Sequence, residues 1–255
     1  MRVLVIGDSC QDIFVYGDIS RICPEGPVPV FNREWEKGND GMALNVVSNL
    51  ISLGAEVQYI TNKELIEKKR YVDKRSNQLV LRVDENDYCK RVGKDILYKV
   101  RNNDYDGFKF DALVIADYNK GFLQEHDIAY LCQNNTNVFI DTKKPIDDYM
   151  LECSYIKINE LEYKAIQDNR SGRWYDEKLI VTLGEDGCQH NGELYSTIRV
   201  TGGDVSGAGD TFMAALVVEY CNSNKIKRAI KYALKAATAV VKKSGVSTIE
   251  LEEIR

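Results

Sequence analysis

The chain has 255 residues, of which 44% are hydrophobic and 29% charged, as in an ordinary soluble globular protein with one large core or two modest ones. Its net charge of −5 at pH 7 disfavours a nucleic-acid partner. No apolar run approaches the roughly 20 residues that span a bilayer, so no membrane partner is expected. Seven scattered cysteines without a CxxC pair disfavour a disulfide framework or a zinc site, and we expect a reducing, cytoplasmic location.

The chain opens with an uninterrupted apolar run at residues 3–6, which predicts a strand buried on both faces of a parallel sheet. Residues 24–30 contain three of the four prolines and therefore predict an edge or protruding segment. The apolar spacing of residues 41–54 predicts a helix that stops at Gly54. A short strand is expected next, at residues 56–60.

Alternating apolar and polar residues at 70–73 and 79–83 predict a hairpin with one exposed face. Beyond this hairpin strands and helices alternate, which predicts a parallel sheet covered by helices on both sides. Because we find no repeat or linker, we expect a single domain over residues 1–255 with a small β appendage. The remaining strands are expected at 112–115, 138–140, 155–158 and 179–182, and the helices near 128 and over 160–166, 211–220 and 226–243.

Polar residues follow the ends of several of these strands, at the edge where open α/β sheets bind ligands. Any one group could instead be a helix cap, a surface pair or a solvated loop. Asn159 and Glu162, for example, have the spacing of a helix N-cap with an acidic residue three positions later. Their common placement at one edge is harder to explain by chance. The groups are Asp8 and Asp12, Asp117–Gly121, Asp141–Lys144, Asn159–Glu162 and Thr182–Gly184.

A glycine-rich stretch, Thr201–Asp210, precedes the apolar run 211–218 and predicts a loop that leads into a helix. Unpaired N–H groups at a helix start, the positive end of the helix dipole and glycines that permit close approach together favour anion binding. Asp210 would place a carboxylate beside that anion, which suits a base that takes a proton from an attacking hydroxyl. The stretch could equally be a glycine-rich turn with Asp210 at a helix N-terminus.

The segment Asp204–Phe212 (DVSGAGDTF) closely resembles the C-terminal signature of the ribokinase-like carbohydrate kinases, and Asn159–Glu162 resembles their N-x-x-E element. The resemblance runs from residue 1 to about residue 248. Within this family the chain is most similar to bacterial D-glycero-β-D-manno-heptose 7-phosphate kinases, the kinase half of the enzyme that makes ADP-heptose. The segments that carry this similarity are 7–12, 16–17, 20–30, 77–78, 81–84, 117–121 and 245–248.

The resemblance implies a ribokinase-like three-layer α/β sandwich with a mostly parallel central sheet. It also implies a small β lid built from segments near 14–35 and 68–84, through which family members often dimerise. The exposed edge of such a lid allows a homodimer without requiring one. The implied reaction transfers the γ-phosphate of ATP, with Mg2+, to a hydroxyl of a sugar or sugar phosphate. Heptose 7-phosphate is the acceptor that we expect.

The resemblance also implies roles for individual residues. Asp210 would be the general base, and the amides of Gly207, Ala208 and Gly209 would form an anion hole. Asn159 and Glu162 would organise Mg2+ and phosphate through water. The nucleotide would contact Lys143 through its phosphates, Thr182, Gly184 and the 233–237 face of the last helix. The acceptor would contact Asp8, Asp12, Gly41 and Asn45. The candidates to bind an acceptor phosphate are Arg21, Arg70, Arg82 and Lys120.

Two departures from the family pattern concern the acceptor. Gly41-Met42 stands where the family has paired glycines, which would place the Met42 side chain near the expected sugar contact. The chain between Thr61 and Lys69 is also shorter than in typical heptose kinases, by about one strand–helix unit. These departures leave open another acceptor, such as a hexose, a ketose phosphate or a nucleoside. A non-catalytic descendant that senses nucleotide or sugar is a further alternative, although an intact Asp210 argues against it.

Overall fold

The computed structural model describes residues 1–167, 175–200, 205–243 and 245–254. In that part of the chain the central sheet has the strand order β14-β13-β12-β11-β10-β9-β1-β4. Pairing is parallel from β4 through β12 and antiparallel for β12–β13 and β13–β14. The strands are β1 (Arg2–Gly7), β4 (Glu56–Thr61), β9 (Ala112–Asp117), β10 (Val138–Thr142), β11 (Tyr155–Asn159), β12 (Leu179–Thr182), β13 (Cys188–His190) and β14 (Glu193–Tyr195).

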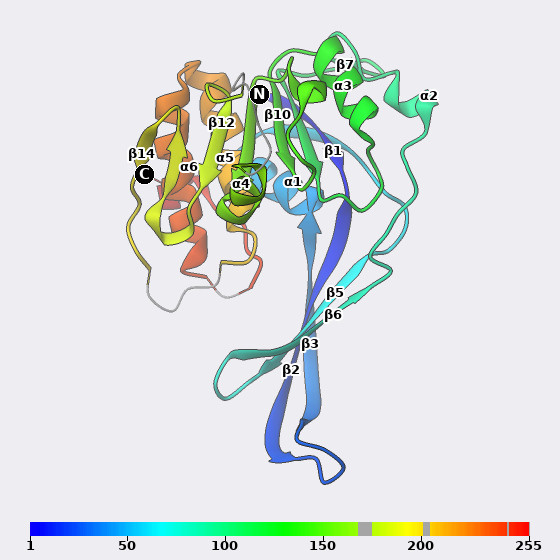
Figure 1. Cartoon of the computed structure of the whole chain (residues 1–255), viewed down its shortest axis with the longest axis vertical. Helices are drawn as coiled ribbons and strands as arrows, with labels where there is room; N and C mark the ends of the chain where they lie inside the picture. Colours follow the sequence, from blue (N-terminus) through cyan, green and yellow to red (C-terminus); the bar gives the residue numbers. More distant parts are fainter. Residues whose placement is uncertain (168–174, 201–204, 244, 255) are drawn as a thin grey trace.

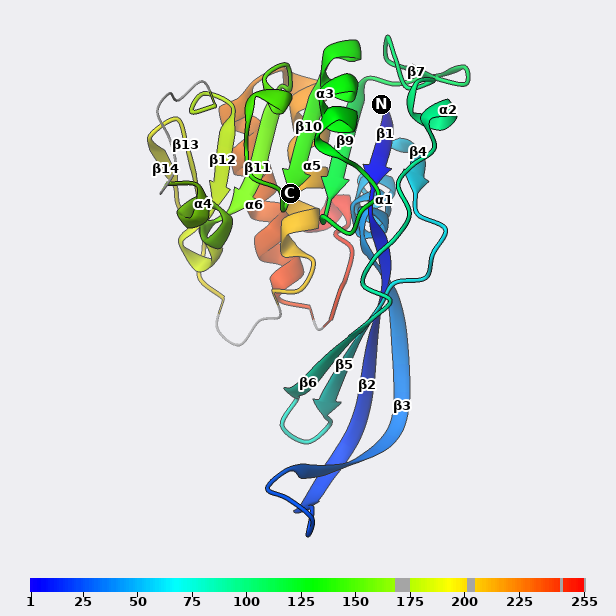
Figure 2. The ribbon, with the colours of Figure 1, turned by 45° about the vertical axis from the view of Figure 1, so that its right-hand side comes forward.

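Helices cover both faces of this sheet (Figures 1 and 2). Because alternate residues of a strand point to opposite faces, Val3 and Val5 pack with α1, α5 and α6, whereas Leu4 and Ile6 pack with α3. The result is a three-layer sandwich with an apolar core on each side. The helices are α1 (Ala43–Ser52), α2 (Lys94–Leu97), α3 (Glu125–Asn134), α4 (Glu160–Gln167), α5 (Ala208–Ser223) and α6 (Ile226–Val241), with short 3-10 turns η1 (Asp148–Met150), η2 (Gly184–Asp186) and η3 (Leu251–Ile254).

A second sheet projects from the sandwich as a long arm, which we call the lid (Figures 1 and 2). Its strand order is β3-β2-β5-β6, with β2 and β5 parallel and the other pairs antiparallel. The proline-containing segment 23–28 forms the turn at the tip, as its composition predicts. The lid strands are β2 (Ser9–Ile22), β3 (Pro29–Met42), β5 (Glu67–Asp73) and β6 (Gln78–Glu85); a separate small hairpin pairs β7 (Asp104–Tyr105) with β8 (Phe108–Lys109).

The prediction of a helix over residues 41–54 is wrong at its start. Gly41 and Met42 end β3, and α1 begins at Ala43. Met42 has a φ of 58°, and its side chain is 3% exposed within the core that contains Leu4 and Cys10. The expectation that Met42 projects toward a sugar contact is therefore also wrong, because this backbone conformation directs the side chain into the core.

Other differences concern elements that the sequence pattern does not reveal. The full length of β2 and β3 is missed because polar residues such as Asp12 and Asp18 interrupt their alternation, and the short α2, β7, β8, β13 and β14 are missed as well. The connection from β4 to β5 spans only residues 62–66, and β4 forms an edge of the central sheet, in agreement with the expected shortening. None of the described helices is long and apolar enough to cross a membrane.

Candidate active site

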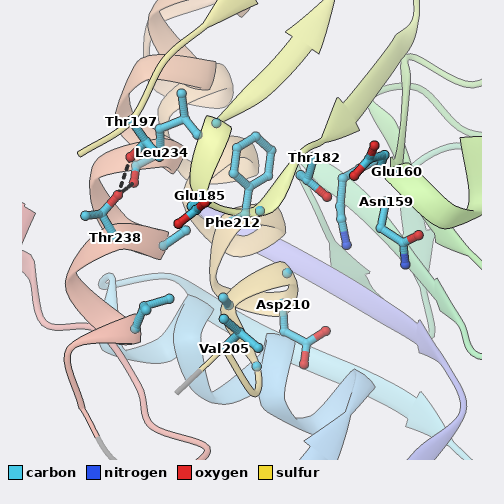
Figure 3. Close-up of a pocket in the computed structure, with 18 of the residues that line it drawn as sticks. Asn159, Glu160, Thr182, Glu185, Thr197, Val205, Asp210, Phe212, Leu234 and Thr238 are labelled. Carbon is cyan, nitrogen blue, oxygen red and sulfur yellow. Dashed lines mark hydrogen bonds between the residues drawn. The ribbon is translucent and has the colours of Figure 1, made fainter. Parts of the chain in front are cut away.

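A cavity of about 680 Å3 lies at the carboxyl ends of the central strands, beside the start of α5 (Figure 3). Figure 3 shows Leu234 and Thr238 of α6 on one side and Asn159 and Thr182, at the ends of β11 and β12, on the other. Asp210 lies at the start of α5 between these two sides. The apolar lining includes Ile198, Val200, Val205, Leu234, Ala237 and Val241, and the polar lining includes Lys143, Lys157, Asn159, Thr182 and Asp210.

The glycine-rich stretch forms the wall of the cavity at residues 207–210, while Thr201–Asp204 lie outside the described residues. Gly207 caps α5 with a φ of 79°, a conformation that favours glycine. A Cβ at this position would lie 2.7 Å from Asn45 Nδ2, so the site has no room for a side chain. The N–H of Thr211 donates to the Gly207 carbonyl at 3.0 Å and closes the first turn. Residues 205–210 thus form the predicted transition from loop to helix.

Asp210 is 6% exposed, and donors from two elements hold its carboxylate. The Asn45 amide donates to Oδ2 at 2.7 Å, and the Tyr118 hydroxyl donates to Oδ1. Burial raises the pKa of Asp210 to about 6; the bond from Tyr118 opposes this rise and the nearby Asp141 adds to it. A carboxylate with this pKa is mainly ionised at neutral pH and can still accept a proton, as a general base must.

Lys157 and Asp141 form a buried ion pair beside Asp210 that sequence reasoning missed. They are partners in register on β11 and β10, and Lys157 Nζ lies 2.5 Å from Asp141 Oδ2. Their side chains are 5% and 2% exposed. A Cβ built on Gly209 would lie 2.9 Å from Lys157 Nζ, so the ammonium lies against the start of α5 and adds positive charge there. The sequence signal for this ion pair was Lys157 itself, a lysine inside the largely apolar strand Tyr155–Asn159 (YIKIN).

Asn159 and Glu162 form a helix capping box. The N–H of Asn159 donates to Glu162 Oε2 at 2.8 Å, and the N–H of Glu162 donates to Asn159 Oδ1 at 2.9 Å. Lys143 also pairs with Glu162 and lines the cavity. Burial alone would lower the pKa of Lys143, but Asp141 and Glu162 raise it above its ordinary value. The capping alternative therefore describes the observed geometry, and a role in organising Mg2+ stays a prediction.

Residues predicted to contact the nucleotide lie along the same cavity. Thr182 and Gly184 line it, and the Thr182 hydroxyl donates to the Ile158 carbonyl at 3.2 Å. On α6 the lining residues are Leu234, Ala237, Thr238 and Val241, whereas Ala233 is fully buried in the core. Lys143 and Lys144 do not form a surface pair, because Lys144 Nζ bonds to the buried Asp117 at 2.6 Å.

Asp8, predicted to bind a sugar hydroxyl, is fully buried in this structure. Its carboxylate accepts the main-chain N–H of Tyr118 at 2.6 Å and that of Phe122 at 3.2 Å. Burial and the neighbouring Asp117 raise the pKa of Asp8. In this geometry Asp8 fixes the loop after β9, which carries Tyr118, and its predicted sugar contact stays a prediction.

Four of the other predicted acceptor residues lie on the face of the lid nearest Tyr118, which we call the inner lid face, whereas Asn45 lies on α1 and Lys120 in the loop after β9. This face is defined here by Asp12, Gly41, Lys68, Arg70 and Arg82, which share a face through the strand register. Asp12 is 6% exposed and forms an ion pair with Arg70. A Cβ at Gly41 would collide with the Asp12 carboxylate and with the Cys10 thiol, which explains the glycine.

Among the cations near this face, most already have carboxylate partners. Arg82 binds Asp84 through two bonds of 2.6 Å, and Lys120 pairs with Asp87. The side chain of Lys68, which sequence reasoning missed, has no hydrogen bond or ion pair with another described residue, and its ammonium lies 5.6 Å from the centre of the Tyr118 ring. Burial lowers the pKa of Lys68; the nearby Cys10 and Asp12 oppose this effect, and Arg82 and Lys120 add to it. Lys68 is therefore a cation available to an anionic ligand.

A second, polar cavity of about 630 Å3 lies beyond Asn45. Its lining includes Gln11 at the root of β2, Asn39 and Asp40 of β3, and residues 246–248. Asn45 lines this cavity, and its amide also donates to Asp210, which lines the first cavity. The described residues that line the second cavity include none of those that define the inner lid face.

The fold is ribokinase-like. Ribokinase from Thermotoga maritima superposes with a TM-score of 0.72 at 18% identity, over 99% of this chain and 97% of its own. Arabidopsis thaliana ribokinase, solved in complex with ribose and ATP, has a TM-score of 0.70 at 15% identity, over 99% and 96% of the two chains. These likenesses confirm the predicted fold.

Residues 123–253 match the pfkB family carbohydrate kinases, and the chain belongs to that family. Among curated relatives, the bifunctional protein HldE of a Nitratiruptor species is 31% identical over 300 residues. The alignment covers 99% of this chain and 64% of that protein, so the chain spans somewhat less than two thirds of the relative's length. The resemblance to carbohydrate kinases is thereby confirmed.

Proposed function

We propose that this carbohydrate kinase transfers the γ-phosphate of ATP to a hydroxyl of a sugar phosphate, with heptose 7-phosphate as the acceptor. The observation that carries the proposal is the buried Asp210 carboxylate, with a pKa of about 6, at a helix start that lines a large cavity. Similarity to the bifunctional HldE protein supports the choice within the sugar kinases.

The cavity suits a nucleotide because its two kinds of lining match the two parts of ATP. The apolar side chains of α6 and of Ile198, Val200 and Val205 offer a surface for a planar base, and Lys143 and Lys157 offer charge to phosphates. The Arabidopsis ribokinase, which shares this fold, binds ATP together with ribose. We place the base against Leu234 and Ala237 and the γ-phosphate beside Lys157 and the start of α5.

In the proposed reaction the acceptor hydroxyl gives its proton to Asp210 as its oxygen bonds to the γ-phosphorus. The bond from that phosphorus to the β–γ bridging oxygen breaks, and ADP leaves with the electron pair. Lys157 and the amides of Gly207, Ala208 and Gly209 stabilise charge on the transferring group. Donors of this kind contribute on the order of 3–4 kcal/mol each to oxyanion stabilisation. Phosphoryl transfer depends mainly on such positioning and charge stabilisation.

Mg2+ fits this site only through water. Magnesium prefers oxygen ligands and keeps several of its waters, and no group of three or more potential ligands is present among the described His, Cys, Asp and Glu residues. Both oxygens of Glu162 already accept hydrogen bonds, but the buried Asp141 Oδ1 has no partner in the described part of the chain. We propose that Glu162 and Asp141 would hold a magnesium ion through its waters, and that the ion would neutralise phosphate charge.

The inner lid face supports a phosphorylated acceptor. A neutral sugar offers no negative charge to Lys68, whose ammonium forms no ion pair with a described residue. Asp12 lies near enough to act on Lys68, but so do two further cations, Arg82 and Lys120. A phosphate group would form charge-assisted hydrogen bonds with Lys68. This arrangement favours a sugar phosphate over an unphosphorylated hexose or a nucleoside.

We also propose that the lid mediates a homodimer. Its edge strands β3 and β6 have unpaired edges within the described sheet, and several large apolar side chains are exposed along it. The most exposed are Ile22, Val28, Trp35, Leu79 and Leu81, each at least 50% exposed. Sedimentation of the wild type and of Leu81→Lys tests this, since a wild type that is monomeric at micromolar concentration contradicts the proposal.

ADP release coupled to a spectroscopic readout, across a panel of sugars and sugar phosphates, tests the function. We expect turnover with heptose 7-phosphate and weaker or no turnover with hexoses, ketose phosphates and nucleosides. Turnover with a different acceptor would support the proposed kinase activity and contradict heptose 7-phosphate as the acceptor. A wild type that binds ATP but phosphorylates nothing on the panel would favour the sensor alternative.

A further inference from the structure

Tyr118 contacts both sides of the candidate site. It follows β9, and its hydroxyl donates to Asp210 Oδ1. The ammonium of Lys68, from the lid, lies 5.6 Å from the centre of its ring, and that of Lys143, from the nucleotide side, lies 5.4 Å away. The main-chain N–H of Tyr118 is held by the buried Asp8. The residue therefore has a fixed backbone and a side chain placed between the two proposed substrates.

We propose that Tyr118 is a positioning residue, which holds the Asp210 carboxylate in the orientation that receives the acceptor's proton. The proposal rests on the proposed function of Asp210 as the general base. Asn45, from α1, holds the other carboxylate oxygen, so donors from two separate elements fix the plane of the group. A carboxylate offers about four acceptor positions, and two donors leave room for the proton of an acceptor hydroxyl.

The hydroxyl of Tyr118 also favours the charged form of Asp210. A hydrogen bond to a carboxylate lowers its pKa, and here it opposes the larger effect of burial. Burial and Asp210 raise the pKa of Tyr118 well above its ordinary value of 10, so the hydroxyl remains a donor at neutral pH. The other groups that face Asp210 are Asn45 of α1, Asp141 of β10, Lys157 of β11, Lys143 after β10 and Cys10 of β2.

Tyr118→Phe separates the hydroxyl from the ring. The phenyl ring keeps its attraction for Lys68 and Lys143, while the bond to Asp210 is lost. Tyr59→Phe is the matched control, because Tyr59 lies on the edge strand β4 and is 54% exposed. Thermal unfolding of both variants shows whether the fold is retained.

The first test measures the Asp210 carboxyl directly by carbon-13 NMR titration, with Asp210→Asn to assign the signal. We expect Tyr118→Phe to raise the titration midpoint by about one pH unit, and Tyr59→Phe to leave it unchanged. An unchanged midpoint in a folded Tyr118→Phe protein overturns the inference. Because no acceptor is needed, this result is independent of whether the proposed kinase function holds.

The second test measures kcat/KM against pH. In Tyr118→Phe the acid limb should move to higher pH by the same amount as the NMR midpoint, with an unchanged KM for ATP. A uniform loss at every pH would show a merely structural role and overturn the inference. Absence of turnover in the wild type with every acceptor would instead overturn the proposed function and leave the NMR result to decide the role of Tyr118.

Discussion

The cavity beside α5 and the inner lid face both present charged side chains to the site, but they hold them differently. Lys157 and Asp141 are at most 5% exposed and come from neighbouring strands of the central sheet. On the lid, the Asp12 and Arg70 side chains are also largely buried, at 9% and 14% exposed, but those of Arg82 and Asp84 are 46% and 26% exposed and belong to a projecting hairpin. Breaking a buried ion pair costs far more than breaking an exposed one. The buried charges of the cavity are therefore costly to change, which suits the proposed transfer step. The exposed charges of the lid can change at little cost, which suits the choice of acceptor.

The largest expected effect concerns Asp210. Asp210→Asn should lower kcat by about 10²–10⁴-fold, because a general base contributes that much, while ATP still binds with near-normal affinity. Calorimetric titration with ATP and steady-state ADP release measure the two quantities. In the wild type the acid limb of kcat/KM should lie near pH 6, the value to which burial raises the pKa of Asp210.

Asp106→Asn is the matched control, since Asp106 is exposed in the turn between β7 and β8. It should leave turnover and ATP binding unchanged. Equal loss of ATP binding and turnover in Asp210→Asn would contradict the assignment of Asp210 as the general base. The contrast between the cavity beside α5 and the inner lid face would then have no catalytic basis.

Lys157 tests the buried side of the comparison. Lys157→Met leaves Asp141 charged and unpaired, which should destabilise the fold by about 3–5 kcal/mol. It should also lower kcat by about 10²–10³-fold, as loss of a preorganised oxyanion donor does. Urea unfolding and steady-state kinetics measure these effects.

The double variant Asp141→Asn, Lys157→Met distinguishes stability from chemistry. We expect it to recover most of the lost stability, because no unpaired charge remains buried, without recovering turnover. Recovery of turnover together with stability would show that Lys157 supports only the fold.

Lys68 tests the lid. Lys68→Met should raise KM for a phosphorylated acceptor by about 10–100-fold, the effect of losing a hydrogen bond to a charged group, and leave KM for ATP unchanged. Lys69→Met is the control. Lys69 follows Lys68 on β5, lies on the opposite face of the lid and pairs with Glu67 and Glu85. Equal effects of the two variants would show that the inner lid face has no special role in acceptor binding.

The smallest effect is on stability. The pKa of Asp210 is raised from an ordinary 3.8 to about 6, so the folded state binds more protons than the unfolded state between these values and loses stability as pH rises through them. Asp210→Asn has no titrating carboxyl at this position, so it does not lose this stability as the pH rises. It should be about 1–3 kcal/mol more stable than the wild type at pH 8, with the gain gone below pH 4. Urea unfolding at both pH values measures the difference, which should be absent for Asp106→Asn.

The sequence predicted most of what lies within one segment of the chain. The DVSGAGDTF segment pointed to Asp210 and to glycines at 207 and 209, and strand–helix alternation pointed to the layered fold. Asn159 and Glu162 were also found from local spacing, and the capping alternative proved to describe their contacts.

What the sequence did not predict depends on contacts between distant segments. Lys157 meets Asp141 only through strand register, and Tyr118 meets Asp210 across 92 positions. Lys68, near the start of β5, lies close to the Tyr118 ring only through the tertiary fold. Met42 was misplaced because its φ of 58° could not be inferred from its residue type, which rarely adopts that conformation.

The central claim is that phosphate passes from ATP to an acceptor hydroxyl at Asp210. Its most direct test is transfer of label from γ-phosphorus-32 ATP in the presence of heptose 7-phosphate, with products separated by chromatography. The account predicts labelled heptose bisphosphate formed in equal amount to ADP by the wild type, and almost none by Asp210→Asn. Label that appears only as inorganic phosphate, or equal transfer by both proteins, would contradict it.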